Sequence, residues 1–496
     1  MNRRNRSVYK AAAVVAGNGI GSGVMAIPYY VLHAGTVGGM AAFAAAYIVS
    51  VLMHFMIATM VLRTMNTDNG HTGKADMLDI FNKYLFKGRA GMILRFAFFA
   101  LLVVVLTANL SAYISGAAQI FTQLLPVNGT VVKVIFFVAA AFVILAGLGA
   151  VCTTEAVTVS VMAVILLLML SFSAFHIKPG ISIPAFGSVK EWAAAYSMIM
   201  FSFSAIFAVP QLVEYMTGGS ERQEEPVGAE EQGKEKRHTG KKEKEELKGY
   251  KEQKQREELK QQKQQYEDSV NKIRRSIWLG LLINLVISVI VAVCTMITSK
   301  EVTDIAIVGW AEAVGGTVRV LGSLFIVFAM LTSFWSIGLA SADIVAGQTH
   351  IKRELSFVIA TVPALIMTLI LSNTFAEYLK LVGGAVAVII ALMAVPSYLL
   401  CMRNQAGEET AYGREAGSGE ESVHGREAGH GEETAHGRKA GSGEESAHGR
   451  EAGHGEEMAH GVKAGRGTET GPGVKAVAAF VFIMYVIMAA GSFISV

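Results

Sequence analysis

The sequence predicts an all-α polytopic membrane protein with about eleven transmembrane helices and two cytoplasmic inserts. Hydrophobic residues make up 52% of its 496 residues, and the mean hydropathy of +0.44 is too high for a soluble protein of this length. Apolar runs of about 20 residues recur along the chain, the length that crosses roughly 30 Å of hydrocarbon as a helix. Most charges lie in the two inserts, so the net charge of +3 gives no reason to expect a nucleic-acid partner.

The apolar runs divide the chain into eleven expected helices and place the protein in the cell membrane, in contact with the lipid bilayer. A sharp turn near Gly149 separates the fourth helix from the fifth. The expected limits are 8–33, 36–62, 92–121, 130–149, 153–175, 190–216, 274–298, 316–345, 355–373, 377–402 and 474–496.

Basic residues indicate how the helices are oriented. The N-terminus and the loops after spans two and eight carry Lys and Arg, whereas the alternate loops "HAGTVGG", "PVNGTV" and "LSNTFAEY" carry none. Because Lys and Arg are enriched in cytoplasmic loops, we expect a cytoplasmic N-terminus and an extracytoplasmic C-terminus. Both inserts then lie in the cytoplasm.

The inserts separate three membrane segments, 1–216, 272–403 and 474–496. Residues 217–271 are rich in Lys, Glu and Gln, and we expect a solvated helix that extends span seven, or a disordered tether, with a regulator docking site as an alternative. Residues 404–473 contain a 12-residue Gly/Glu/His repeat that begins at Glu408 and predicts disorder. The repeat holds six of the 12 histidines, so metal capture is the alternative to a tolerant polar loop. Otherwise no metal or cofactor is expected, and the three cysteines are expected to be buried thiols.

The first span contains "AGNGIGSGVMAIP", from Ala16 to Pro28, in an otherwise apolar run. Glycines allow unusual backbone angles and proline removes a hydrogen-bond donor, so we expect two half-helices with an unwound joint at residues 19–23. Free N–H groups at the start of the outer half favour an anion, and free carbonyls at the end of the inner half favour a cation. An amino acid zwitterion fits both ends. The alternative is that the small residues only allow close helix packing.

A second break is expected in span six, in "FSFSAIFAVPQLVEYM" from Phe201 to Met216. Ser202, Ser204 and Pro210 interrupt this apolar helix within nine residues. Two broken helices five spans apart are typical of transporters built from inverted repeats.

Four segments together resemble the hydroxy and aromatic amino acid permeases of the amino acid/auxin permease group, within the APC superfamily. They are the span-one segment, "LSAYISGAAQIF" in span three, the span-six segment, and "LTSFWSIGLASAD" in span eight. This chain has Ala205 where the family usually has glycine, and Ile206 and Phe207 appear as two extra residues before the proline. The resemblance implies a leucine-transporter-type 5+5 inverted repeat plus one helix, and ion-coupled symport of an amino acid into the cell.

The resemblance also implies a substrate site between spans one and six at the membrane midplane. Backbone N–H groups would bind the carboxylate and carbonyls would bind the amino group, while a tyrosine covers the substrate and phenylalanines form the pocket wall. For the tyrosine and phenylalanines, ordinary packing is the alternative. The expected substrate-binding residues are Asn18, Gly19, Gly21, Ser22, Gly23, Tyr113, Phe201, Ser202, Phe203, Ser204 and Phe207.

The same resemblance implies a coupling site where Thr332 and Ser333 face the carbonyls of Gly17 and Ile20. Hydroxyls that bond back to their own helix are the alternative. The sequence leaves H⁺ and Na⁺ open, and the family favours H⁺.

Charged residues suggest an inner gate. Asp343 at the cytoplasmic end of span eight is expected to pair with Arg6 or Lys10. Glu155 in span five is a further acid that is either functional or interfacial.

The sequence favours a secondary transporter over two other classes. A transporter-like amino acid sensor that signals through the inserts is one alternative, and a transporter of another small organic solute is the second. No HExxH, GxSxG or phosphate-binding loop is present, so an enzyme is not expected.

Overall fold

The computed structural model describes residues 3–21, 23–67, 75–176, 183–217, 241–299, 302, 309–310, 313–371, 375–404 and 471–492. Every regular element within these ranges is helical, as the apolar runs predict. Contacts divide the chain into a large unit, residues 1–398 and 476–496, and a small unit, residues 399–475. In the small unit, the described residues are 399–404 and 471–475.

The helices correspond in order to the expected spans. The first five spans are α1 (Arg3–Ile20) with α2 (Gly23–Ala34), α3 (Thr36–Thr67), α5 (Gly88–Leu124), α6 (Gly129–Leu145) and α7 (Leu148–Ser173). The next three are α8 (Val189–Ser202) with η1 (Ile206–Ala208) and α9 (Val209–Thr217), α10 (Lys241–Thr298), and α12 (Gly316–Thr349). The last are α13 (Arg353–Ile370), α14 (Phe375–Ile389) with the π-helical η2 (Ile390–Ala394), and α16 (Pro472–Ser492). A short helix, α4 (Met77–Tyr84), lies between α3 and α5 in the sequence.

Nine helical stretches in the described residues are long and apolar enough to cross a bilayer, and α1 with α2 forms a tenth that bends by 58°. Helix α6 is apolar but has only 17 residues, about 25 Å at 1.5 Å per residue. It takes the place of the fourth expected span, so each of the eleven spans has a counterpart. The turn after α6 is at Gly147, two residues before Gly149, because Gly147 adopts a φ of 98° and Gly149 is already inside α7.

The distribution of side chains fits a bilayer solvent. Large apolar side chains such as Phe96 (72% exposed) and Phe142 (77% exposed) lie on the surface. Polar side chains, among them Asn284 and Thr332, are fully buried between helices. Lipid offers no hydrogen bonds, so the polar groups of a membrane protein are satisfied in its interior.

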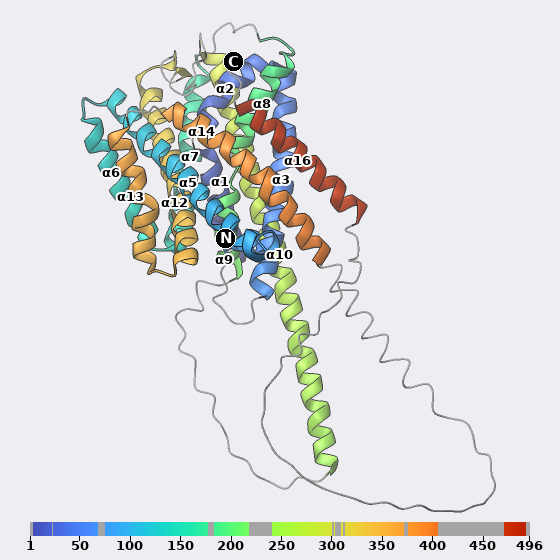
Figure 1. Cartoon of the computed structure of the whole chain (residues 1–496). Coiled ribbons are helices and arrows are strands. Elements are labelled where there is room, and N and C mark those ends of the chain that lie inside the picture. The colour runs from blue at the N-terminus through green and yellow to red at the C-terminus, as the bar shows by residue number, and fades with distance from the viewer. Residues whose placement is uncertain are drawn as a thin grey trace, which may run out of the picture. The chain divides into compact units, whose positions relative to one another are not determined.

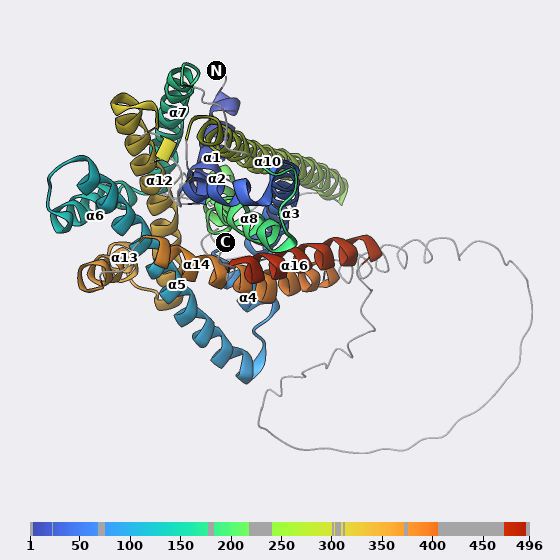
Figure 2. The same ribbon diagram turned by 90° about the horizontal axis from the view of Figure 1, so that it is seen from above.

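The broken first span lies among other helices. Helix α1 packs against α7, α10 and α12, while α2 packs against α8. Both views place these two half-helices between the helices that surround them (Figures 1 and 2). Irregular backbone at membrane depth is tolerated only where protein surrounds it, so this position allows a joint.

The described part of the Lys/Glu-rich insert is helical. Helix α10 continues without interruption from Lys241 to Thr298 and so joins the insert to span seven. Figure 1 shows its first half extending beyond the neighbouring helices. Residues 218–240 of this insert and the 12-residue repeat within 405–470 lie outside the described residues.

Candidate functional site

The first joint is narrower than the sequence predicts. Helix α1 remains helical through Ile20, and α2 begins at Gly23, so only Gly21 and Ser22 separate them. Ser22 lies outside the described residues. The predicted unwinding of residues 19, 20 and 23 is wrong.

Hydroxyl groups from two neighbouring helices bind the last carbonyls of α1, which accounts for its length. Thr332 Oγ1 donates to the carbonyl of Gly17 at 2.9 Å, and Ser333 Oγ donates to the carbonyl of Asn18 at 2.9 Å. Ser202 Oγ donates to the carbonyl of Gly19 at 3.1 Å. The final carbonyls of a helix have no partner within the helix, and here other helices provide the donors.

Two of the glycines allow the broken spans to touch. A Cβ atom on Gly19 would lie 2.6 Å from the carbonyl oxygen of Ser202, and one on Gly23 would lie 2.7 Å from Ser202 Cα. Both positions are closer than a carbon atom can approach. Close contact between the two joints therefore requires glycine at both positions.

The second joint, predicted in span six, is present between α8 and η1. Helix α8 ends at Ser202, and residues 203–205 are irregular. The backbone N–H of Ser204 donates to the carbonyl of Phe201 at 3.1 Å, and Ala205 donates to Phe203 at 3.0 Å. Pro210 lies in the first turn of α9, where its missing N–H costs no helical hydrogen bond.

Asn284 of α10 lies where the two joints meet. Its Nδ2 donates to the carbonyl of Ser202 at 2.8 Å. The same atom is the first that a Cβ atom on Gly19 would meet. Ser288 Oγ donates in turn to Asn284 Oδ1 at 3.2 Å. This fully buried amide ties span seven to both breaks.

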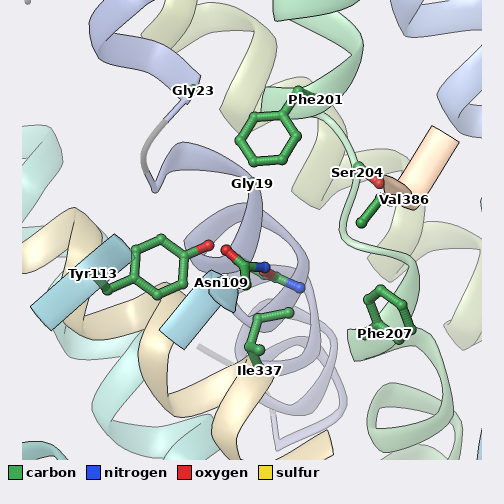
Figure 3. A pocket seen from close by; sticks show the side chains of 10 residues that line it. Gly19, Gly23, Asn109, Tyr113, Phe201, Ser204, Phe207, Ile337 and Val386 are labelled. Carbon is green, nitrogen blue, oxygen red and sulfur yellow. The ribbon is translucent and has the colours of Figure 1, made fainter. Parts of the chain in front are cut away.

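The two joints enclose a small cavity, whose side chains converge in Figure 3. Its volume is ≈ 20 Å³, room for about one water molecule. An amino acid fits only after the lining side chains move. The lining residues are Asn18, Gly19, Gly23, Asn109, Tyr113, Phe201, Ser204, Phe207, Ile337 and Val386.

Three lining residues bury polar atoms that have no hydrogen-bond partner among the described residues: Asn18 Nδ2, Asn109 Oδ1 and Ser204 Oγ. Buried polar atoms in native proteins are rarely left unpaired. A ligand with both donor and acceptor groups would satisfy all three. In the described part of the chain, no three His, Cys, Asp or Glu side chains are grouped to hold a metal ion.

Most of the expected substrate-binding residues line this cavity, and several do not. Ser202 and Gly21 lie beside it as parts of the two joints, where Ser202 binds the end of α1 and Gly21 faces Ser333. Phe203 is fully buried but is not among the cavity-lining residues. Of the two expected phenylalanine walls, Phe207 lines the cavity.

Sequence reasoning missed four residues of the site: Asn109, Asn284, Ile337 and Val386. The two asparagines carried a usable signal, because each interrupts an apolar run with a polar amide, in "TANLS" and "LINLV". Ile337 and Val386 carried none, since apolar residues are common throughout the spans.

The expected coupling residues lie together. Thr332 and Ser333 both donate to carbonyls of α1, and Ser333 also reaches the Gly17 carbonyl at 3.2 Å. Ile20, the last residue of α1, is fully buried. Thr332 Oγ1 additionally bonds to the carbonyl of Ala329 in its own helix. The hydroxyl therefore contacts span one, as the resemblance implies, and also bonds back to its own helix, as the alternative expected.

The expected gate residues lie on two helices, Arg6 and Lys10 on α1 and Asp343 on α12. Lys10 donates to Thr153 Oγ1 of α7 at 2.7 Å, and Arg6 is exposed. Asp343 is near Asp76, the N-cap of α4. Burial, followed by the negative charges of Asp79 and then Asp343, raises the pKa of Asp76 well above its usual range, although N–H donors from the α4 backbone oppose the shift.

Comparison with known proteins places these observations in a family. The profile described as the tryptophan/tyrosine permease family matches residues 4–225 and 262–420, which is most of the chain. No curated protein sequence matches significantly.

Among solved structures, the chain is similar to MHP1, a nucleobase-cation-symport-1 family transporter in a closed conformation with bromovinylhydantoin bound. The two are 14% identical with a TM-score of 0.55, over 80% of this chain and 79% of that one. A manganese transporter from Eremococcus coleocola gives 13% identity and a TM-score of 0.48, over 79% and 78%. The likeness to MHP1 shows the fold alone, and the expected leucine-transporter-type membrane fold is confirmed.

Proposed function

Because the chain belongs to the tryptophan/tyrosine permease family, we propose that it imports an aromatic amino acid together with a proton, by alternating access. The protein is a multi-pass membrane transporter and not an enzyme. The substrate class, the coupling ion and the direction of transport are the content of the proposal.

One observation carries the proposal: a cavity between two broken spans is lined by aromatic rings and by three buried polar atoms without partners. Phe201, Phe207 and Tyr113 supply the rings. Aromatic side chains pair favourably with one another at centroid distances of about 4.5–7 Å. An amino acid with an aromatic side chain matches both kinds of lining group.

The ends of the zwitterion have natural partners in this lining. The first N–H groups of α2, which starts at Gly23, have no acceptor within the helix and favour the carboxylate. The amide of Asn18 is a second donor. Asn109 Oδ1 and Ser204 Oγ are acceptors for the ammonium group, and they replace the carbonyls at the end of α1, which already accept hydroxyls.

The hydroxyls on α12 lie at the expected coupling position. Thr332 and Ser333 each bond directly to α1 carbonyls at 2.9–3.2 Å. Hydroxyl and carbonyl oxygens are also the ligands that a sodium ion takes, so this geometry fits either ion. The proton is chosen because the permease family that the sequence resembles favours H⁺.

The membrane orientation is part of the proposal. The basic residues of the N-terminus and of alternate loops support a cytoplasmic N-terminus, which would put Arg6, Lys10 and Asp343 at the inner end of the site. An ion pair between Asp343 and one of the two basic residues would close that end, which stays a prediction.

A ligand screen followed by a flux measurement tests the proposal. The purified full-length protein is heated with each of the twenty amino acids, with and without sodium and at two pH values. A ligand at 100 times its Kd stabilises by about 2.7 kcal/mol, so tryptophan, tyrosine or phenylalanine should raise the melting temperature. The rate of uptake into proteoliposomes should then increase with an imposed pH gradient and should not change when sodium is added. Binding without flux would favour a sensor, and sodium-driven flux would contradict proton coupling.

A further inference from the structure

Glu155 is a carboxylic acid buried inside the membrane part of the protein. It lies in α7 with 0% of its surface exposed. Neither of its carboxyl oxygens has a hydrogen-bond partner among the described residues. An ionised carboxylate is costly in such surroundings, because water and donors are both missing. In this conformation the group is therefore a neutral, protonated acid.

Charged groups from α1 and α9 approach the first turns of α7, which carry Glu155. The Cys152 thiol, one turn before Glu155 on α7, lies within electrostatic reach of Glu155, Lys10 and Glu214. Lys10 of α1 donates to Thr153 Oγ1 at 2.7 Å. Lys10 and Glu214 are thus the charged groups that reach the residue one turn before the acid.

Charged and titratable groups on the other neighbouring helices are engaged elsewhere. Tyr9 of α1 bonds with Ser160 at 2.8 Å, and Asp343 of α12 lies near Asp76. Lys133 of α6 bonds to the carbonyl of Thr368. The basic residues of α10, Lys272, Arg274 and Arg275, line a different cavity with α1 and α3.

A line of side chains leads from the substrate cavity along α9 to Glu214. Phe207 lines the cavity, Gln211 follows four residues later and Glu214 three residues after that. Residues spaced by three and four share one face of a helix. Gln211 is 2% exposed and its Oε1 atom has no hydrogen-bond partner among the described residues.

Helix α1 is the element that can uncover Glu155. It packs against α7, and it is separate from α2, which begins at Gly23 and lies at an angle of 58° to it. Tyr9 and Lys10 hold it to α7 through single hydrogen bonds. If α1 tilts about the joint, water reaches the face of α7 that carries Glu155.

We propose that Glu155 is the proton-binding site of the symport, an inference that rests on the proposed function. While the cavity is open to the outside, water that enters past Gln211 and Glu214 gives a proton to a carboxylate oxygen of Glu155 and forms its O–H bond. When α1 moves away, the carboxyl O–H bond breaks, its electron pair stays on the carboxylate, and cytoplasmic water takes the proton.

Two transport measurements on the same proteoliposomes test this role. Counterflow exchanges labelled amino acid at equal pH and needs no net proton movement, whereas accumulation requires the pH gradient. One proton crossing a gradient of one pH unit supplies the free energy for about tenfold accumulation. Glu155→Gln should keep counterflow and lose pH-driven accumulation to the level of protein-free vesicles, together with substrate-induced proton entry. Glu354→Gln, at an exposed position on α13, should retain both.

The outcomes separate this inference from the proposed function. If Glu155→Gln accumulates as much amino acid as the wild type, Glu155 is not the proton-binding site, but the proposed symport is not contradicted. Absence of amino acid counterflow in the wild type overturns both. If the glutamine variant does not fold, Glu155→Asp should shift the pH at which uptake is half-maximal, and an unchanged pH profile overturns the assignment.

Discussion

The two broken spans are interrupted by different chemistry. The joint between α1 and α2 lies in a glycine-rich segment, and hydroxyls of Thr332, Ser333 and Ser202, on two other helices, bind the end of α1. The joint between α8 and η1 contains no glycine and is closed mainly by short backbone hydrogen bonds within residues 199–205. The first break depends on side chains of other helices, whereas the second is formed largely by hydrogen bonds among its own consecutive residues.

Under the proposed alternating access, this difference favours the first joint as the one that moves. Helix α1 is bound at its broken end by side chains of α8 and α12, so a ligand that changes those contacts would change the position of α1. A coupling between substrate and helix movement requires an element with two arrangements that the ligand distinguishes.

The largest effect should come from Gly19→Ala. The added methyl group would lie 2.6 Å from the Ser202 carbonyl oxygen, and overpacking of this kind costs about 1–3 kcal/mol. We expect uptake in proteoliposomes to fall by roughly tenfold to a hundredfold, because 1.4 kcal/mol corresponds to a factor of ten.

Gly149→Ala is the matched control, since a Cβ atom there would meet nothing within 4 Å. It should retain wild-type uptake. Normal uptake by Gly19→Ala would contradict close contact between the two joints.

The next effect should come from the double variant Thr332→Val, Ser333→Ala. It removes the α12 hydroxyls that bind the Gly17 and Asn18 carbonyls, and each lost hydrogen bond costs about 0.5–1.5 kcal/mol. We expect uptake to fall by about three- to a hundredfold. The measurement is initial uptake rate at equal protein content.

Thr361→Val is the control for that double variant. Thr361 is also fully buried, but its hydroxyl bonds to Phe357 within its own helix α13. If both variants lose the same uptake, the first joint does not depend specifically on α12.

Much of this architecture could be predicted because it follows from strong local patterns. Apolar runs predicted the spans, and the glycines of residues 16–23 predicted the first joint. Pro210 and its neighbouring serines predicted the second joint. The residues of two distant segments were expected to share one site, and seven of the expected side chains or glycines do line the cavity, namely Asn18, Gly19, Gly23, Tyr113, Phe201, Ser204 and Phe207.

The remainder depends on contacts that local pattern does not encode. The resemblance predicted that Thr332 and Ser333 face carbonyls of span one, and they do, but it did not predict that Ser202 binds the Gly19 carbonyl or that α1 extends to Ile20. Likewise, Asn284 joins both breaks only because α10 passes beside them. Positions such as these require the tertiary arrangement.

A smaller effect should come from Asp76→Asn, remote from both joints in sequence. Burial and the charges of Asp79 and Asp343 raise the pKa of Asp76, so the folded protein favours its protonated form. The stability linked to this proton is present below the unfolded pKa and is lost as pH rises through the folded pKa. Each unit of raised pKa corresponds to about 1.4 kcal/mol.

Asparagine retains the N-cap bonds to α4 but has no charge. The Asp76→Asn variant should therefore melt higher than the wild type at about pH 8 and similarly at about pH 3, below both pKa values. Thermal melts of the purified protein over that range measure this. If the melting temperature of the variant depends on pH as that of the wild type does, the destabilising charge is not that of Asp76.

The smallest effect should come from Ala205→Gly, which installs the residue usual in the family at the second joint. Ala205 has a φ of −93°, a conformation that needs no glycine. Glycine increases the conformational entropy of the unfolded chain, which lowers the free energy of unfolding by about 0.4–1 kcal/mol. The melting temperature should therefore drop slightly, and uptake should remain within about fivefold of the wild type. The uptake of Ala205→Gly is compared with that of Gly23→Ala. The second variant places a methyl group 2.7 Å from Ser202 Cα and should lose most uptake. Equal losses in the two variants would mean that the second joint also depends on close approach, and the contrast between the two breaks would no longer hold.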